Sequence, residues 1–475
     1  MNEIFTNEPS SVVCTCAPGL SQFLSKEIRA LGFRVEHSTD TTVTTEGTLA
    51  DCMILNLRLR TAHRVLYTLD KFKARFPDRL YSELVEIPWE RYIDPSGYFS
   101  IDKAVENESI NNTNFASLKA KDAIVDRIRR VTGSRPNTGN SRHSLCLFLY
   151  WAGEDASIYI DTTGESLSFR GYRGFTSEAP MRESLAAAVV MASGWDGRTP
   201  FVNPMCGCGT IAIEAAWIAQ NRPPALYREN FSFMHLACYE PPMWTSLCAA
   251  AIKEFEASKG TVPPIIATDI DANMIEASRE NAKLAEVDGL ITFDTCDFML
   301  TDVPELPALP ELADVADATI ASAPEAPAEL DASEAPAAST TESESAPESK
   351  SESAINADGE ESNEFAVEKS ITESAAQSAA AARGVIIVNP PYGGRIGDPM
   401  RLRDIYSGLG VFIKKHCAAY DGYIFTGNPD LASVAGLSWE ASRPFYNGTI
   451  ECELLINPEI TPEAESIFKR RAARG

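Results

Sequence analysis

The chain has 475 residues, of which 44% are hydrophobic and 9% aromatic, and its formal net charge at pH 7 is −25. This length predicts two or three domains with sizeable cores. The apolar runs are shorter than the roughly 20 residues of a membrane span, and the N-terminus lacks the features of a signal peptide. We therefore expect no membrane association. The eleven cysteines are scattered and lack zinc-ribbon spacing, which favours reduced thiols in the cytoplasm and no metal site.

The negative charge is concentrated in one segment. Residues 301–382 contain 5 Asp and 14 Glu but only 2 Lys, so they carry a net charge of −17. They are rich in Ala, Glu, Ser and Pro and contain one aromatic residue, a composition typical of disorder. We expect an acidic, low-complexity insertion here, and the rest of the chain is not too acidic to bind RNA.

Residues 1–168 predict an α+β region. Its first part has the order strand, helix, strand, strand, helix, which suggests a small α+β domain. Apolar residues recur at helical spacing from Leu20 to Leu31, and Gly32 then ends the helix. Two further strands are expected near the end of the region, over residues 144–151 and 156–161.

Basic residues gather in two patches of this region, 58–75 and 119–142, and in a short basic, aromatic bridge at 168–173. A solvated helix face is the common alternative for such runs, so the patches alone are weak evidence for RNA binding. The candidates for contacts with an RNA backbone are Lys119, Lys121, Arg129, Arg130, Arg135, Arg142, Arg170 and Arg173.

A glycine-containing turn follows a short strand that begins at Phe201. Gly207 and Gly209 allow a ligand to approach the backbone closely, and the apolar helix that follows offers free N–H groups at its N-terminus. Sites for NAD, FAD and S-adenosylmethionine all use such turns. The candidate cofactor contacts are Met205, Cys206, Gly207, Gly209 and Thr210.

Two later strands end in aspartates. Asp269 follows a buried strand, and a carboxylate there suits the ribose hydroxyls of an adenosyl group, whereas Asp271 fits the N-cap of the next helix. Asp269 lies 60 residues after Gly209, far beyond the roughly 20 of a dinucleotide fold, which excludes an NAD site. Asp297 ends the next strand, where a turn residue is the alternative interpretation.

The sequence Asn389-Pro390-Pro391-Tyr392 follows four apolar residues, Val385 to Val388. The apolar run predicts a buried strand, which the prolines end because they lack backbone donors and fix φ. Ligands of open α/β sheets bind at such strand ends. The Asn389 amide oxygen and a proline carbonyl could accept hydrogen bonds from the two N–H groups of an exocyclic amine, and Tyr392 could stack on the base. The alternative is a proline-rich loop that caps a core strand.

Asn-Pro-Pro-Tyr resembles the amino-methylating signature of class I S-adenosylmethionine-dependent methyltransferases. Residues 204–214 resemble motif I of these enzymes, although Asn203 and Cys208 stand where Asp and Ser are common. Residues 115–125 look like the helix of a THUMP domain, and Tyr446 to Cys452 is similar to the family's ending. The resemblance covers residues 11–457 apart from the insertion, and it points to the bacterial THUMP-containing 23S rRNA guanine-N2 methyltransferase family.

The resemblance implies an α/β fold. Residues 169–300 and 383–475 would form a class I, Rossmann-like methyltransferase sheet, and residues 1–168 a ferredoxin-like and THUMP-containing RNA-binding region. S-adenosylmethionine would be the cofactor, with Asp297 accepting from the adenine amine. The partner would be 23S rRNA, from which a guanine is flipped so that its N2 amine meets the catalytic residues at 389–392.

Three alternatives remain open. A tRNA guanine-N2 methyltransferase pairs the same domains, and a DNA adenine-N6 methylase shares Asn-Pro-Pro-Tyr but should carry a DNA target-recognition domain. A non-catalytic RNA-binding or assembly factor could keep the fold without activity, and the departures at Asn203 and Cys208 keep this alternative open. Binding of S-adenosylmethionine would separate the last alternative from the enzymes.

Overall fold

The computed structural model describes residues 7–110, 112–174, 181–258, 262–306, 383–392, 399–441 and 444–457. All of them belong to one compact unit. Residues 307–382 lie outside the described ranges, so the disorder of the acidic insertion stays a prediction. The insertion was predicted to start at residue 301, and this is too early. Thr301 is buried, and its Oγ1 lies 2.7 Å from Oγ1 of Thr268 in the core of the second sheet.

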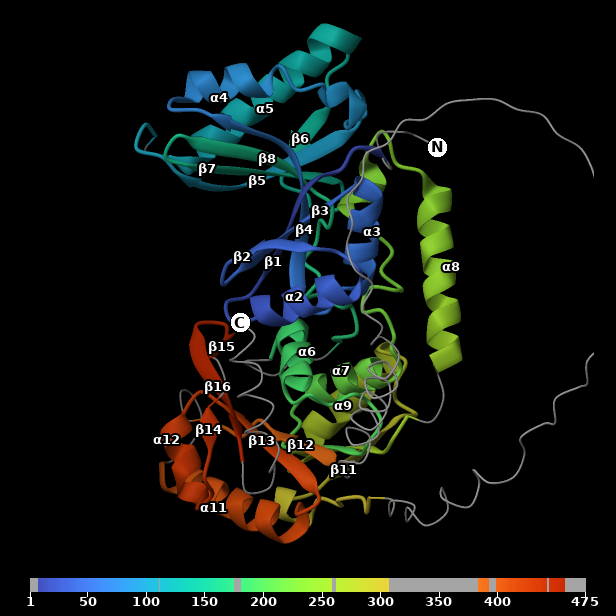
Figure 1. The fold of residues 1–475 in the computed structure, drawn as a ribbon, viewed down its shortest axis with the longest axis vertical. Helices are drawn as coiled ribbons and strands as arrows, with labels where there is room; N and C mark the ends of the chain where they lie inside the picture. The colour runs from blue at the N-terminus through green and yellow to red at the C-terminus, as the bar shows by residue number, and fades with distance from the viewer. Residues whose placement is uncertain are drawn as a thin grey trace, which may run out of the picture. The chain divides into compact units, whose positions relative to one another are not determined.

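The N-terminal region is built on one eight-stranded sheet with the order β2-β3-β1-β4-β8-β7-β5-β6 (Figure 1). The strands are β1 (Ser10–Cys16), β2 (Val35–Ser38), β3 (Thr42–Gly47), β4 (Ala62–Lys73), β5 (Tyr98–Glu106), β6 (Asn137–Gly139), β7 (Leu145–Ala152) and β8 (Asp155–Asp161). The helices are α2 (Ser21–Ala30), α3 (Leu49–Arg58), α4 (Pro77–Leu84), η1 (Trp89–Arg91) and α5 (Thr113–Thr132).

Strand β4 joins the two halves of this sheet. Its first half pairs with β1, up to Tyr67 opposite Val12, and its second half pairs with β8, from Leu66 to Lys73. A capping box between Thr48 and Asp51 starts α3 on one half of the sheet. On the other half, Gly133 in the left-handed conformation ends α5.

The second sheet has the order β11-β10-β9-β12-β13-β16-β14. Its central strands are parallel, and β16 closes it antiparallel to β13. The strands are β9 (Phe201–Pro204), β10 (Ile265–Asp269), β11 (Ile291–Thr295), β12 (Gly384–Val388), β13 (Tyr420–Thr426), β14 (Glu440–Ala441), β15 (Phe445–Asn447) and β16 (Ile450–Ile456). The predicted α/β fold, with a Rossmann-like sheet after an α+β region, is confirmed.

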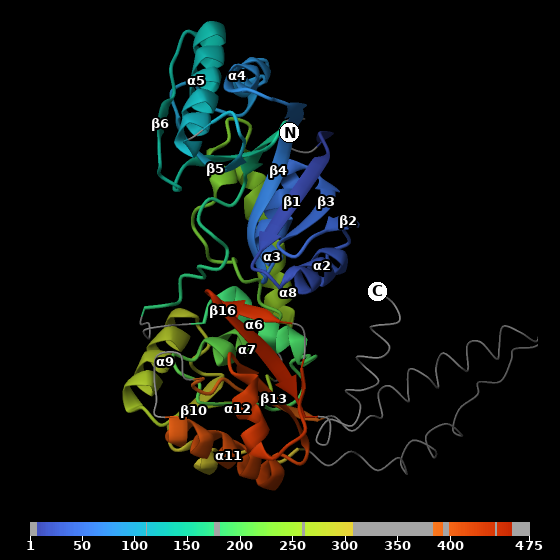
Figure 2. The same ribbon diagram turned by 90° about the vertical axis from the view of Figure 1, so that its left-hand side faces the viewer.

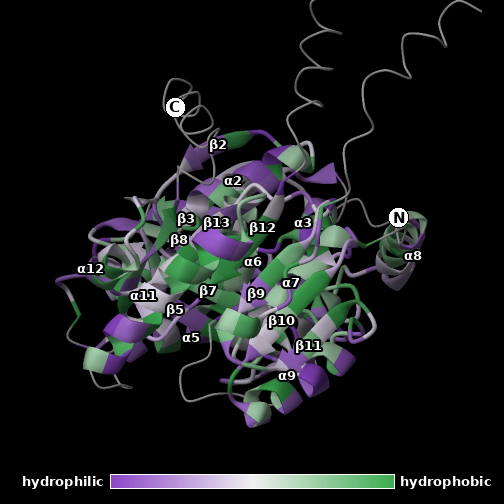
Figure 3. Ribbon diagram, turned by 90° about the horizontal axis from the view of Figure 1, so that it is seen from below, coloured by the Kyte–Doolittle hydropathy of each residue, from purple (hydrophilic) through white to green (hydrophobic). Residues whose placement is uncertain are grey.

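Helices cover both faces of the second sheet (Figure 2). Buried side chains of α6, α7 and α9 pack on one face, and those of α11 pack on the other. Helix α7 is almost entirely hydrophobic, as Figure 3 shows, because it is buried on all sides. The elements are α6 (Glu183–Ala192), α7 (Thr210–Ala219), η2 (Ser232–His235), α8 (Pro241–Ser258), α9 (Ala272–Leu284), η3 (Phe298–Leu300), α11 (Pro399–His416), α12 (Pro429–Ala432) and η5 (Ser433–Ala435).

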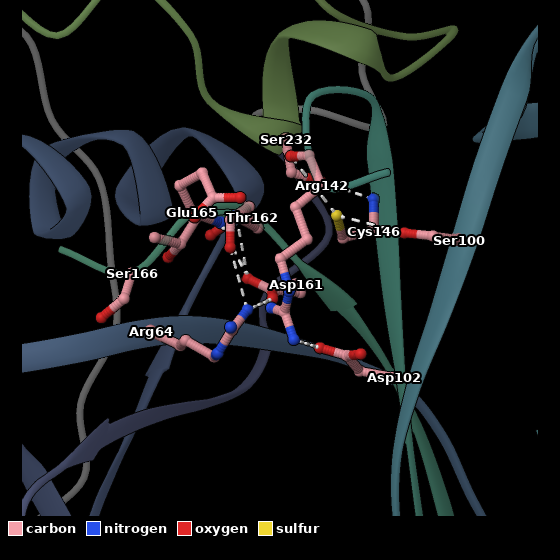
Figure 4. Close-up of polar contacts among 12 residues, drawn as sticks. Arg64, Ser100, Asp102, Arg142, Cys146, Asp161, Thr162, Glu165, Ser166 and Ser232 are labelled. Carbon is pink, nitrogen blue, oxygen red and sulfur yellow. Dashed lines mark hydrogen bonds and ion pairs between the residues drawn. The ribbon is translucent and has the colours of Figure 1, made fainter. Parts of the chain in front are cut away.

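The long connection between α7 and β10 is tied to the N-terminal sheet. Ser232 Oγ accepts a hydrogen bond from the Cys146 N–H at 2.8 Å, as Figure 4 shows. Phe233 N donates to Thr162 O at 3.1 Å, and Arg228 Nη2 donates to Thr163 O at 3.2 Å. The long connection thus holds the second half of the chain against the N-terminal sheet.

Strands β9 and β12 separate at their carboxyl ends. Their pairing runs only from Phe201 opposite Val385 to Val202 opposite Ile386. By contrast, β9 pairs with β10 as far as Pro204, and β12 pairs with β13 through Val388. The chain order also reverses between β9 and β12, which makes this opening the topological switch point where open α/β sheets bind ligands.

Candidate active site

The turn after β9 forms one side of the opening. Met205, Gly207 and Gly209 all have positive φ, at 56°, 55° and 77°. A Cβ on Gly209 would lie 3.1 Å from Ser278 Cβ, so the packing of α9 requires a glycine there. A Cβ on Gly207 would meet nothing within 4 Å. The backbone at Gly207 therefore borders open space in which a ligand could lie against it.

Asp269, at the end of β10, holds this turn in place. Its Oδ2 accepts a hydrogen bond from Gly207 N at 2.9 Å, and its Oδ1 accepts from Asp271 N at 3.0 Å. A carboxylate has about four acceptor sites, so both oxygens can still accept from ribose hydroxyls. Asp271 caps α9 through a hydrogen bond from Asn273 N at 2.9 Å, as expected.

Helix α9 supplies two further supports that the sequence did not reveal. Ser278 Oγ lies 2.7 Å from Gly207 O, and Asn281 Nδ2 donates to Cys208 O at 3.1 Å. Asn281 Oδ1 also accepts from Gly174 N at 3.0 Å. These polar residues sit three apart on an otherwise amphipathic helix and are buried. That spacing on one face is a signal that could have identified them.

Asp297 stands at the end of the neighbouring strand, β11. Its Oδ1 accepts from Met299 N at 2.9 Å, which caps η3, and the side chain is exposed. Cys296 N donates to Asp269 O at 3.1 Å, so the ends of β10 and β11 lie together. The structure thus places Asp297 beside Asp269 and also gives it the turn role that was the alternative.

The other side of the opening is formed by Asn389 to Tyr392, directly after β12. The Asn389 Oδ1 atom is buried and accepts no hydrogen bond from any described residue. Pro390 is buried, and Pro391 is half-buried. A buried amide oxygen without a donor costs free energy, and this atom has capacity to accept a hydrogen bond.

The Tyr392 ring is fixed from two directions. Asn447 Nδ2, from the β15–β16 hairpin, donates to its hydroxyl oxygen at 3.1 Å. At the end of β13, a Cβ on Gly427 would lie 3.0 Å from Tyr392 Cδ2, so only a glycine lets the ring lie this close. Burial raises the pKa of Tyr392 above its usual value. The ring is therefore a neutral, positioned surface at the rim of the opening.

The structure separates the predicted RNA-contacting residues into two groups. Arg129, Arg130 and Arg135 are exposed on or just beyond α5, and Lys121 is half-buried. Lys119 forms an ion pair with Asp78 at 2.9 Å, and Arg142 pairs with Asp102 (Figure 4). The exposed arginines keep their charges available to a phosphate backbone, whereas the paired residues share theirs with carboxylates.

Arg170 was predicted to contact RNA, and this is wrong because its side chain is only 1% exposed. Its Nε lies 3.3 Å from Oε1 of the buried Glu214 on α7. Its guanidinium also donates to Leu167 O at 2.7 Å and to Arg60 O at 2.5 Å. Arg170 therefore ties the N-terminal region to α7.

The prediction that Arg173 contacts RNA is wrong for the same reason, because its side chain is only 15% exposed. Its Nη2 donates to Met181 O at 2.6 Å and lies 3.5 Å from both Thr210 Oγ1 and Glu183 Oε2. Arg173 thus supports the starts of α6 and α7. A basic run in a sequence does not show which side of it faces solvent.

Within the described ranges, no cluster of three or more His, Cys, Asp or Glu side chains is arranged to hold a metal ion. None of the described helices is both long and apolar enough to cross a membrane.

Three family models match this chain. The RMKL-like methyltransferase domain matches residues 170–307 and 351–456, about half of the chain. The RlmL ferredoxin-like domain matches residues 11–66, and the THUMP domain matches residues 74–161. Along the chain, the matches follow in the order ferredoxin-like, THUMP and methyltransferase.

Individual proteins agree with these matches. The ribosomal RNA large subunit methyltransferase K/L of Syntrophotalea carbinolica is 30% identical over 94% of this chain and 53% of its own length. The chain spans about half the length of the curated relatives it matches. The crystal structure of SMU.472, solved with SAH, has a TM-score of 0.72 at 22% identity, covering 95% of this chain and 98% of that chain.

A second solved structure comes from Listeria monocytogenes and is named as a predicted N6-adenine-specific DNA methylase. It is 25% identical with a TM-score of 0.70, covering 94% of this chain and 96% of that chain. Solved chains thus share the whole arrangement of the two sheets, including the N-terminal region.

Proposed function

Because the chain belongs to the RMKL-like methyltransferase family, we propose that it transfers a methyl group from S-adenosylmethionine to the exocyclic N2 amine of a guanine in 23S rRNA. The observation that carries this proposal is the buried Oδ1 of Asn389 at the switch point, which accepts no hydrogen bond from any residue that the structure describes. An exocyclic amine is a donor that suits this acceptor, and the strand end is where such a ligand would lie.

The turn after β9 fits S-adenosylmethionine. Gly207 borders open space, and the half-buried carboxylate of Asp269 is held at the adjacent strand end, where ribose hydroxyls could reach it. Met205, Cys206 and Thr210 complete the turn, and Asp297 stands where it could accept from an adenine amine. When bound, the cofactor supplies an electrophilic methyl group on a sulfonium.

The residues after β12 act on the amine. Asn389 Oδ1 and the Pro390 carbonyl would accept hydrogen bonds from its two N–H groups, which would orient the nitrogen lone pair toward the methyl group. The amine would take up the methyl group that the sulfonium supplies, with S-adenosylhomocysteine as the leaving group, and the methylated nitrogen would then lose one proton to water. Orientation supplies most of the rate enhancement. The methylated nitrogen carries a positive charge and is acidic, so water can take its proton without a dedicated base.

The choice of substrate rests on the N-terminal region. Its THUMP match and the exposed Arg129, Arg130 and Arg135 support capture of an RNA backbone through charge. Relatives named as large subunit rRNA methyltransferases favour rRNA over tRNA. We place the protein in the cytoplasm, where such RNA is made.

Product analysis tests the proposal. The purified protein is incubated with methyl-labelled S-adenosylmethionine and with unmodified rRNA, tRNA or DNA, and the products are digested to nucleosides. We expect label in N2-methylguanosine from rRNA. Label in tRNA would change the substrate, and label in N6-methyladenine of DNA would change the base. No label despite cofactor binding would overturn the catalytic proposal as it stands.

A further inference from the structure

The opening between β9 and β12 contains an irregularity in its hydrogen bonding. Val385 N donates to Pro200 O at 2.9 Å. In a parallel ladder, such bonds repeat every two residues. The repeat would bring the N–H of residue 204 to the carbonyl of Ile387. Residue 204 is a proline, which has no N–H to donate.

The side chain of Asn203 supplies the missing donor. Its Nδ2 donates to Ile387 O at 2.8 Å, and the residue is fully buried. Without this bond the Ile387 carbonyl would face the opening unpaired, which is costly for a buried backbone group. The bond crosses the opening at the last point where the two strands approach each other.

We propose that Asn203 is a positioning residue that fixes the carboxyl end of β12. Ile387 lies two residues before Asn389, so a shift of its carbonyl would move the acceptors of the amine. The proposal rests on the proposed function because methyl transfer is one of its readouts. An ionised aspartate at this position could not donate to this carbonyl. The amide of Asn203 thus has a specific structural role.

The missing backbone N–H of residue 204 provides a direct test, because a substitution can restore it. Replacing Pro204 by alanine restores a backbone N–H at the point where the ladder needs one. Asn203→Ala should lower kcat about tenfold to a hundredfold, since small misplacements of reacting groups cost about this much. The KM for S-adenosylmethionine should stay within about twofold, because the bonds that hold the β9 turn at Gly207 and Cys208 remain in place in this variant.

The double variant Asn203→Ala/Pro204→Ala should recover most of the lost kcat, whereas Pro204→Ala alone should change little. Asn56→Ala is a matched control, because it removes another fully buried amide, one that bonds Cys52 O and Thr162 within the N-terminal region. It should lower the thermal midpoint without changing kcat at saturating RNA.

Two outcomes would overturn the proposal. One is a double variant that stays as slow as Asn203→Ala, and the other is a large rise in the KM for the cofactor with kcat unchanged. If the wild-type protein methylates no nucleic acid, the proposed function fails, but the ladder is still tested. The thermal midpoint should then fall in Asn203→Ala and recover when Pro204→Ala is added.

Discussion

The two strand ends that face each other across the opening are built in opposite ways. After β9, side chains bond the turn backbone at Gly207 and Cys208 from two neighbouring elements, β10 and α9. After β12, Asn389 Oδ1 is buried without a donor among the described residues, and Tyr392 is tethered through its hydroxyl. The turn after β9 is thus held by side chains of neighbouring elements, whereas the residues after β12 keep an acceptor in reserve. The contrast concerns the turn and not β9 itself, where Asn203 Oδ1 is also buried without a donor among the described residues. Under the proposed function, the turn holds the cofactor and Asn389 meets the reacting group.

Asn389→Ala tests the difference between the two strand ends most strongly. It removes the acceptor held in reserve and touches none of the bonds that hold the β9 turn. We expect kcat to fall about 100- to 1000-fold, as when one preorganised group that stabilises a transition state is lost. The dissociation constant for S-adenosylmethionine, measured by calorimetry, should stay unchanged. Equal losses in cofactor affinity and rate would show that the two sides are not separable.

Asp269→Ala should have the complementary effect. It removes the acceptor for Gly207 N and the carboxylate proposed for the ribose, and hydrogen bonds to charged groups contribute about 1.5–3 kcal/mol. The dissociation constant for S-adenosylmethionine should therefore rise about 10- to 100-fold. Asp269→Asn keeps one acceptor and should lie between. Unchanged cofactor affinity in both variants would remove Asp269 from the cofactor side.

Tyr392→Phe should give the smallest effect. It loses the hydrogen bond from Asn447 but keeps the aromatic ring, and a neutral hydrogen bond contributes about 0.5–1.5 kcal/mol. We expect kcat/KM for RNA to fall less than about tenfold. Burial raises the pKa of Tyr392, so its hydroxyl stays neutral below the usual tyrosine pKa. The pH–rate profiles of the variant and the wild type should then be parallel up to about pH 10. A fall in the wild-type rate alone on the alkaline side would mean that Tyr392 ionises earlier.

The sequence was sufficient to predict both strand ends, because each consists of a short apolar run followed by residues with strong local preferences. The Gly-x-Gly turn and Asn-Pro-Pro-Tyr lie where the hydrophobic pattern places them, and Asp271 caps its helix. These features depend on near neighbours in the chain.

The features that were missed depend on distant partners. Ser278 and Asn281 support a turn that lies some 70 residues earlier. Their spacing places them on one face of α9, but the local sequence does not show that this face meets the turn. Arg170 was placed on the surface because its charge suggested solvent, yet Glu214 and two carbonyl groups compensate its burial. Strand β5 was also unpredicted, since it gains its place by pairing with β7, about 45 residues later. Such long-range pairings are set by the whole fold.

Strand β4 has a consequence for how this architecture could have been assembled. The ferredoxin-like match ends at residue 66 and the THUMP match begins at residue 74, but one strand, Ala62–Lys73, runs through the boundary and pairs with both halves. A genetic exchange at this boundary would cut a strand in the middle of an eight-stranded sheet and expose edges on both products. The two modules are therefore expected to be inherited together, even though each has its own family signature.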